Sequence, residues 1–401
     1  MIMQTVRALY RKGVKMTILA QVADNEAINV EKIPKEVRKW ADYYLVEVAQ
    51  KIDLISKISH FLFSQESVEV SQYRSLGFVA ELNKIVAQNP PDIVQLEGLE
   101  MAAYRDEVSV EKCVLRIHGF ESHKYNKMIA ATKDRVRQNY YQVCKARLAV
   151  WEWKQVLSGK YVGVLLNDGA VKKAISAEMN TQITKKEAAK KAGKPEPPVG
   201  ILPKIFTPIH GFDFNTIAVS ENLEREPHSA YWLGSLDNSY SQNVLTWFIT
   251  KIWEKVFAAY PHAKLYVAAR YRSPNFLPAI TATQGVYWED NIAHLYDFMA
   301  SKAIMVLPML GYAGQQLKLL EAMAIGNAIV ASAPAVLPIP AKQGAQLFIA
   351  QDEQAFIQQL STLIEHPNIG AAMGGIAKEW VRKHASQESM DVRLWSFYVG
   401  C

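Results

Sequence analysis

The chain has 401 residues and a formal net charge of +6. Half of the residues are hydrophobic, which excludes an intrinsically disordered chain. No run of 18 apolar residues occurs, so no transmembrane helix is predicted, and basic residues interrupt the first twenty residues in a way that no signal peptide shows. This length fits two domains of about 200 residues each.

Charge is distributed unevenly along the chain. Residues 1–204 carry 32 basic and 23 acidic side chains, a balance of +9, whereas residues 205–401 carry 13 and 16, a balance of −3. Such asymmetry suggests that the first half faces an anionic partner. The three cysteines, at 113, 144 and 401, have no metal-binding spacing. They indicate a reducing, cytoplasmic location.

The first half alternates predicted strands with helices. The stretch 123–157 is predicted to be mostly helical, and 180–200 is predicted to be a surface helix or an excursion because it is polar and ends in prolines. Apolar runs predict strands at 14–21, 43–48, 92–98, 112–118 and 160–166.

The second half alternates more regularly. Strands are predicted at 230–236, 263–269, 303–309, 327–332 and 346–350. Helices are predicted at 243–260, 291–300, 314–326, 352–365 and 370–384. Strands separated by helices of this length imply parallel βαβ units and a doubly wound α/β sheet.

The segment 307–332 is the strongest candidate for a ligand site. A buried strand, a loop with glycines and a helix follow one another, and the free N–H groups at the helix start, around Gly314 and Gln315, suit a diphosphate. Lys318 could neutralise phosphate, and Glu321 could accept hydrogen bonds from ribose hydroxyls. The alternative is a Lys–Glu surface pair on an ordinary crossover.

The segment KLLEAMAIGNAIVAS (318–332) resembles the nucleotide-binding stretch of the retaining GT-B glycosyltransferases (glycosyl transferases group 1, family 4-like). The preceding segments YWLGSLD (231–237) and WFITKIWEKVFAAYPHAKLYVAAR (247–270) resemble the same family in the same order. In the first half, DIVQLEG (92–98) and VLRIHGFESHKY (114–125) also resemble it. The resemblance implies two Rossmann-like domains facing across a cleft, with the nucleotide sugar on the second. It assigns residues 1–210 to the acceptor side and 211–384 to the donor side, with a helix at about 385–401 that packs back on the first domain.

The resemblance also implies roles for individual residues. Glu321 takes the position that holds the ribose, and His118 takes the position of a histidine that lies under the transferred sugar. For His118 the alternative is a satisfied interior histidine at the end of a strand. Glu121, three residues on, is the second catalytic candidate, and it would also serve as an acidic group at a helix start.

Three more residues are candidates for donor binding because they end predicted strands. Arg270 could bind the diphosphate through its guanidinium, and Gly234 with Ser235 would let a phosphate or sugar approach the backbone. The alternatives are a solvated arginine and a plain turn.

The chain departs from the family pattern at several positions. Ala313 stands where the family has its first acidic residue, and Gln316 stands where a subgroup has arginine. The family also opens with a strand and a glycine-rich loop, whereas this chain begins at what reads as the first helix. These departures bear on catalysis more than on fold.

The stretch 123–160 carries nine basic and two acidic residues with aromatic residues between them. Helices of this composition lie on anionic membrane surfaces. A solvated face whose aromatics belong to the core is the alternative, and nothing in the sequence points to nucleic acid.

The resulting hypothesis is a metal-independent, retaining glycosyltransferase without a cofactor. It would move a hexose from a nucleoside-diphosphate sugar to a glycan or lipid-linked acceptor, in the cytoplasm and at the inner membrane face if 123–160 binds it. The alternative is a weakly active or inactive GT-B protein that binds a nucleotide sugar or a partner enzyme. An epimerase or hydrolase has no specific support.

Overall fold

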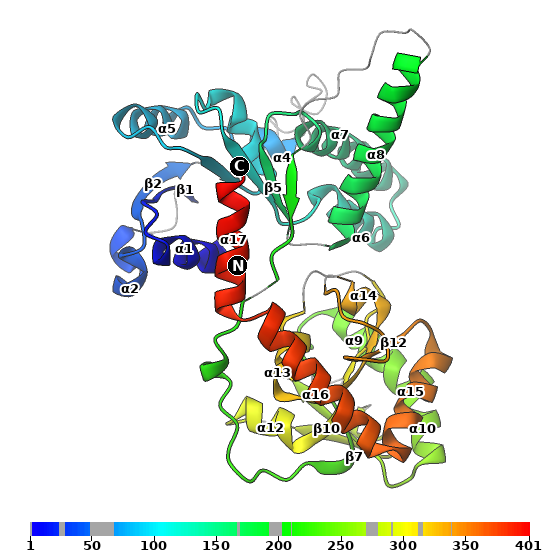
Figure 1. The fold of residues 1–401 in the computed structure, drawn as a ribbon. Helices are drawn as coiled ribbons and strands as arrows, with labels where there is room; N and C mark the ends of the chain where they lie inside the picture. Colours follow the sequence, from blue (N-terminus) through cyan, green and yellow to red (C-terminus); the bar gives the residue numbers. More distant parts are fainter. Residues whose placement is uncertain are drawn as a thin grey trace. The chain divides into compact units, whose positions relative to one another are not determined.

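The computed structural model describes residues 2–23, 29–48, 68–166, 169–191, 203–209, 211–269, 280–289, 292–311, 316–337 and 339–401. The chain forms two compact units: residues 1–208 with 391–401, and residues 209–390 (Figure 1). Among the helices within these ranges, none is long and apolar enough to cross a membrane.

The first unit contains two parallel sheets. Strand β1 (Thr17–Ala23) pairs with β2 (Asp42–Val48). The second sheet has the order β3 (Val94–Glu97), β4 (Cys113–Ile117), β5 (Gly163–Leu166) and β6 (Lys204–Phe206). All residues of β4 and β5 are buried, which is why these segments read as continuous rather than alternating apolar runs.

Helices connect the strands of this unit, as parallel pairing requires. The α-helices are α1 (Ile2–Arg11), α2 (Lys35–Arg38), α4 (Val68–Ser71), α5 (Leu76–Gln88), α6 (Lys124–Ala131), α7 (Arg135–Val156), α8 (Gly169–Lys191) and α17 (Gln387–Val399). Short 3₁₀ turns are η1 (Val30–Lys32), η2 (Glu100–Glu107) and η3 (Glu121–His123). The predicted surface stretch 180–200 is helical up to Lys191, and its remainder lies outside the described residues.

The second unit is built on one parallel sheet of six strands in the order β12-β11-β10-β7-β8-β9. The strands are β7 (Glu226–Gly234), β8 (Lys264–Ala269), β9 (Val286–Glu289), β10 (Lys302–Leu307), β11 (Ala328–Ser332) and β12 (Phe348–Ala350). Counted along this unit, the order is 3-2-1-4-5-6 read from the other edge, which is that of a doubly wound Rossmann sheet. The strand order therefore reverses between β7 and β10.

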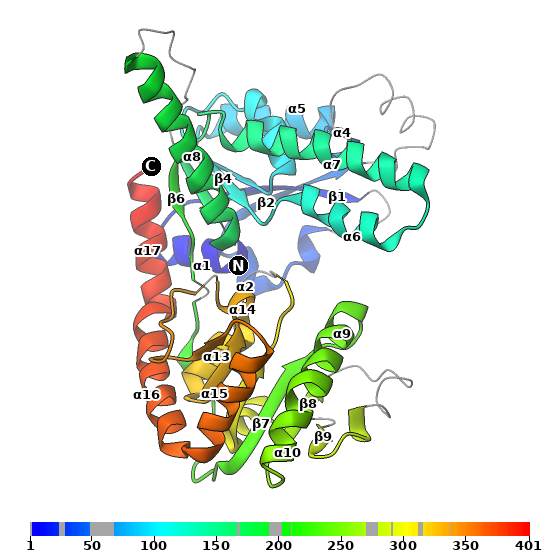
Figure 2. The ribbon, with the colours of Figure 1, turned by 90° about the vertical axis from the view of Figure 1, so that its right-hand side faces the viewer.

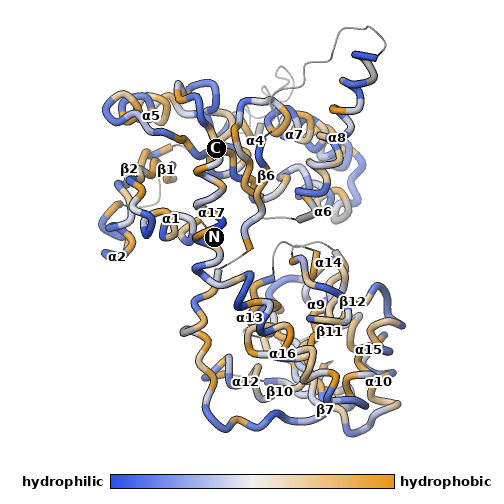
Figure 3. The backbone as a smooth tube through the Cα atoms, viewed as in Figure 1, coloured by the Kyte–Doolittle hydropathy of each residue, from blue (hydrophilic) through white to orange (hydrophobic). Residues whose placement is uncertain are grey.

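Side chains alternate between the two faces of this sheet. Tyr231 and Met305 pack on one face with α13 (Leu317–Ile325) and α16 (Pro367–His384). Trp232 and Val306, their neighbours in the chain, pack on the opposite face. Successive residues of a strand point to opposite sides, so burying both faces requires apolar residues at every position. Figure 3 shows this hydrophobic interior and a hydrophilic stretch just before β7.

The helices of this unit cover both faces. Figure 2 shows α9 (Ser239–Phe248) and α10 (Glu254–Ala259) beside β7 and β8. A π-helical segment, η5 (Ile249–Trp253), joins them, so the predicted helix 243–260 is continuous but irregular. The remaining elements are η4 (Phe214–Thr216), α12 (Leu295–Ser301), α14 (Ala333–Val336) and α15 (Glu353–Glu365).

Helix α13 ends at Gly326, whose φ of +87° favours glycine. The helix begins at Leu317, three residues later than the sequence predicts, and residues 312–315 lie outside the described part. The first turn of α13 therefore contains Lys318.

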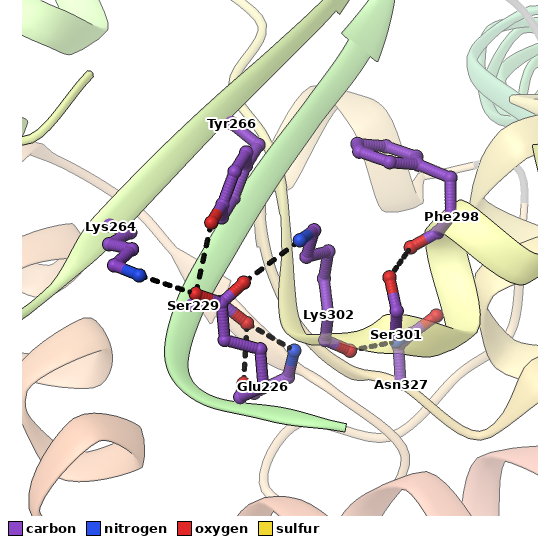
Figure 4. Close-up of polar contacts among 9 residues, drawn as sticks. Glu226, Ser229, Lys264, Tyr266, Phe298, Ser301, Lys302 and Asn327 are labelled. Carbon is purple, nitrogen blue, oxygen red and sulfur yellow. Dashed lines mark hydrogen bonds and ion pairs between the residues drawn. The ribbon is translucent and has the colours of Figure 1, made fainter. Parts of the chain in front are cut away.

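A polar cluster ties the amino ends of three strands together (Figure 4). The carboxylate of Glu226 accepts hydrogen bonds from Lys264 and Lys302, each at 2.8 Å, and from the Tyr266 hydroxyl at 2.9 Å. Burial acts to raise the pKa of Glu226, but these donors outweigh it and lower the pKa to about 2. The ionised carboxylate of Glu226 thus holds the amino ends of β7, β8 and β10 together.

Acidification is expected to remove this contribution. The pKa in the folded state lies below the ordinary 4.5, so the stabilisation is present above pH 4.5 and is lost as the pH falls toward 2. Glu226→Gln should lower the free energy of unfolding by about 1–2 kcal/mol at pH 6, since solvent screening reduces the full effect. Urea unfolding at pH 6 and pH 2.5 would measure it. An equal deficit at both pH values would contradict the assignment, and Glu254→Gln is the exposed control.

Candidate functional site

The carboxyl ends of β7 and β10 mark the point where the strand order of the second unit reverses. In doubly wound sheets this point opens a crevice in which ligands bind. Lys318, in the first turn of α13 after β10, donates a hydrogen bond of 2.7 Å from Nζ to the carbonyl of Leu233 in β7. The Lys318 side chain therefore lies across the switch point of the sheet.

Lys318 is not a surface residue. Its ammonium lies 5.5 Å from the ring centroid of Trp232, and burial lowers its pKa to about 8. The structure forms no ion pair between Lys318 and Glu321, so the alternative of a surface Lys–Glu pair is wrong. Among the described residues the Lys318 ammonium contacts a carbonyl and a ring face, so this half-buried group retains charge that an anion can neutralise.

Glu321 lies one turn further along α13. Its carboxylate accepts a hydrogen bond from the Tyr296 hydroxyl of α12 at 3.4 Å, and burial raises its pKa. Lys318 and Glu321 thus supply a cation and a half-buried hydrogen-bond acceptor at the same end of the sheet. This combination suits a ligand with an anionic part and hydroxyl groups.

Gly234 and Ser235 lie at the end of β7, beside the Lys318 contact. A Cβ on Gly234 would come within 2.3 Å of the Trp232 ring, so glycine at this position lets the ring pack against the backbone. Asp237 and Asn238 follow; the Asn238 side chain accepts from the Ser241 N–H and caps α9. The segment after β7 therefore exposes the polar residues Ser235, Asp237 and Asn238, while Leu236 is buried.

The other donor-side candidates cannot be placed. Arg270, Gly314 and Gln315 lie outside the described residues. Gln316 precedes α13, and its side chain makes no capping hydrogen bond there.

In the first unit, His118 directly follows β4, and its side chain is 40% exposed. The alternative prediction, an interior histidine at the end of a strand, is therefore wrong. Its Nε2 lies 3.5 Å from Oε2 of Glu97, the last residue of β3. The two side chains meet because β3 and β4 are parallel neighbours whose carboxyl ends share one edge.

Glu97 is held by a chain of buried and partly buried groups that the sequence did not reveal. Arg116, which is completely buried, donates to Glu97 at 3.2 Å and to the Thr5 hydroxyl of α1 at 2.6 Å. Gln95 also donates to Glu97, and the Tyr398 hydroxyl of α17 donates to Gln95. Burial acts to raise the pKa of Glu97, but His118, Arg116 and Gln95 together lower it. The carboxylate beside His118 is thus fixed and ionised.

Glu121 opens the turn η3, as expected for an acidic residue at a helix start. Its side chain is 58% exposed and lies 3.8 Å from the Lys124 ammonium. It makes no ion pair with His118, so the structure does not join the two predicted catalytic candidates in one hydrogen-bonded pair.

The chain is similar in structure to sucrose-phosphate synthase from Thermosynechococcus elongatus, with a TM-score of 0.59 and 14% identity over 99% of this chain and 91% of that one. It is also similar to the Anabaena protein HepE in complex with UDP, with a TM-score of 0.58 and 13% identity over 97% and 100%. A third match is WaaG, a glycosyltransferase involved in lipopolysaccharide biosynthesis, with a TM-score of 0.54 and 12% identity over 98% and 94%.

These likenesses define the class of fold: the chain has the GT-B fold, with two Rossmann-like domains. Residues 227–366, about a third of the chain, match the family model of glycosyl transferases group 1. No sequence among curated proteins matches the chain significantly. The matched region contains Lys318 and Glu321, so the family match and the switch-point site coincide.

Proposed function

We propose that the protein is a retaining glycosyltransferase that uses a nucleoside-diphosphate sugar. The observation that carries this proposal is the position of Lys318 and Glu321 at the switch point of a glycosyl transferases group 1 domain. Lys318 would neutralise the diphosphate, and Glu321 would accept hydrogen bonds from the ribose. The Anabaena protein HepE, which has the same fold, was crystallised with UDP-glucose.

His118 would lie under the transferred sugar, with Glu97 as its positioning residue. The carboxylate lies 3.5 Å from Nε2 of His118, and it would fix the orientation of the imidazole. Arg116 and Gln95 hold Glu97 in place. Glu121, exposed near the same turn, would contact the acceptor.

The test is a transfer and hydrolysis assay with a panel of UDP- and GDP-sugars and a glycan or lipid-linked acceptor. Transfer with retention of the anomeric configuration supports the proposal, and hydrolysis alone makes the protein a hydrolase. Binding without turnover would support the second candidate, an inactive GT-B protein that binds a nucleotide sugar or a partner enzyme. Gln316, at the position where a family subgroup has arginine, favours that candidate.

Donor binding is expected to need no divalent cation. In this proposal the ammonium of Lys318 and the N–H groups at the start of α13 stabilise the charge of the leaving diphosphate, which is work that a metal ion does in other transferases. Calorimetric titration of UDP should give the same affinity, within twofold, in EDTA and in Mg²⁺. Binding that EDTA abolishes would contradict the prediction.

The acceptor side is proposed to attach to anionic membranes through α7. Four of its apolar side chains are exposed at spacings of four, three and seven residues, which places them on one face: Val136, Tyr140, Val143 and Val150. Arg135 and Arg137 are exposed beside this face. Insertion of apolar side chains with basic neighbours is the usual mode of interfacial helices.

Vesicle co-sedimentation tests this attachment. Each basic residue near an anionic surface contributes about 1 kcal/mol, so Arg135→Gln/Arg137→Gln should lower the partition coefficient roughly tenfold or more, and high salt should lower it further. The matched control is Lys172→Gln/Lys173→Gln on α8, where both side chains are exposed. Equal recovery with neutral and anionic vesicles would make a soluble acceptor the better explanation.

A further inference from the structure

A cavity of about 660 Å³ opens at the amino ends of the strands in the second unit. Arg225 directly precedes β7, Ala300 lies in α12 just before β10, and Ile325 ends α13 just before β11. Lys318 and Ser235, in contrast, belong to the carboxyl ends of the same strands. The cavity is therefore separate from the proposed donor site.

Three cationic side chains line this cavity: Arg225, Lys378 and Arg382. No carboxylate does so among the described residues. Acidic side chains do lie close to the lining residues. Asp297 accepts two hydrogen bonds from Ser220, Glu379 lies 3.8 Å from Arg382, and Glu226 is bonded to Lys264 and Lys302. Glu221 and Glu224 flank lining residues in the chain and are exposed. A concave wall with charge of one sign concentrates anions.

Arg225 is held in a fixed place by its surroundings. Its Nε donates to the carbonyl of Ala300 at 3.3 Å, and its Nη1 donates to that of Gly326 at 3.0 Å, so it joins the ends of α12 and α13. Arg225 is exposed to solvent as a residue, and partial burial of its guanidinium lowers the pKa. Within the described residues Nη2 has no hydrogen-bond partner, so it can receive a ligand oxygen without a loss of existing contacts.

Lys378 is also available. It lies on α16, one turn after Gly374, which packs against the backbone of Gly326, and it makes no hydrogen bond or ion pair in the described part of the chain. Arg382 follows one turn further along α16 and lines the same wall. The two cations of α16 therefore line the same cavity as Arg225.

The rest of the wall is largely apolar. The segment that leads into β7 supplies it, and the hydrogen bonds of Ser220 to Asp297 tie this segment to α12 (Figure 1). Its apolar lining residues are Phe214, Ile217, Val219 and Leu223. A ligand for this cavity thus needs an anionic group for the cations and an apolar part for these side chains.

We propose that the cavity binds an organic phosphate, with its phosphate on Arg225, Lys378 and Arg382 and its apolar part against Phe214 and Ile217. The volume falls within the range of about 300–1,000 Å³ that is usual for small-molecule sites. The phosphate could belong to a free metabolite or to a lipid headgroup. The inference does not depend on the proposed transferase activity.

Calorimetric titration of the full chain with phenyl phosphate at constant ionic strength tests the proposal. Saturable binding is expected, with a dissociation constant raised at least tenfold in Lys378→Gln/Arg382→Gln. The matched control is Lys251→Gln/Lys255→Gln, which removes the same charge from exposed positions outside the cavity and should change affinity less than twofold. Lys318→Gln should also leave affinity within twofold.

Several results would overturn the proposal: no saturable binding, an equal loss in the control double variant, or a loss in Lys318→Gln that is absent from the cavity variant. Circular dichroism and thermal unfolding verify that the variants fold. Monomeric dihexanoyl phosphatidic acid and glucose 6-phosphate then separate the two sources of phosphate, because the ligand that binds more tightly and responds to the cavity variant identifies the source.

Discussion

Glu321→Ala is expected to weaken the binding of UDP or GDP about 100-fold. The carboxylate would accept two hydrogen bonds from ribose hydroxyls. A hydrogen bond to a charged group contributes about 1.5–3 kcal/mol. A loss near the lower end of their sum corresponds to about two powers of ten in affinity. Calorimetry on the purified variant measures this change directly.

Glu321→Gln should have a smaller effect than Glu321→Ala, because an amide oxygen still accepts a hydrogen bond but carries no charge. Glu254→Ala, on the exposed side of α10, is the matched control and should leave affinity unchanged. Tyr296→Phe removes the hydroxyl that bonds to Glu321 and tests whether the carboxylate needs this partner. If the affinities for UDP and GDP were both unchanged in Glu321→Ala, the role assigned to this residue would be wrong.

The second large effect concerns Lys318 and pH. Burial lowers the pKa of the free ammonium to about 8, so a rising fraction of the protein loses this charge above pH 8. A diphosphate at this site would bind the protonated form, and its affinity should therefore fall about tenfold per pH unit once the pH exceeds the pKa of the free state. Below pH 7 the affinity should no longer depend on this group.

Lys318→Gln separates this group from every other titrating residue. The variant should bind a nucleoside diphosphate about 10- to 100-fold more weakly at pH 7, since a charge-assisted hydrogen bond is lost, and its affinity should be flat between pH 7 and 9.5. Lys255→Gln, at an exposed position in α10, should keep the wild-type profile. A pH slope that persisted in Lys318→Gln would assign the titration to another residue.

Much of the second unit could be predicted from the sequence. Apolar runs such as 303–309 and 327–332 become strands β10 and β11, because burial on both faces allows few polar residues within them. Gly326 ends α13 as predicted, since only glycine adopts its left-handed backbone without strain. The irregular segment η5 was not predicted, because a π-helical turn keeps a nearly helical spacing of apolar residues.

Some residues of the candidate sites could also be predicted from the sequence, and others could not. The residue types around Lys318 and Glu321 predicted an anionic ligand with hydroxyl groups, because their spacing on one helix is local information. Glu97 and Arg116 were not predicted as site residues. The available signal was that each is a charged residue within a predicted apolar strand, 92–98 or 112–118. Their pairing depends on the register of β3 with β4, in which these two residues are direct partners.

The sequence by itself determined the alternation of strands and helices, the charge of each half and the residues near the start of α13. These properties depend on side chains within a few residues of one another. Only the tertiary structure decided the strand order that places β10 beside β7, and hence the contact of Lys318 with Leu233. It also decided which cations line the cavity at the opposite ends of the strands. Strand order and long-range contacts arise from packing between segments far apart in the chain, which no local pattern encodes.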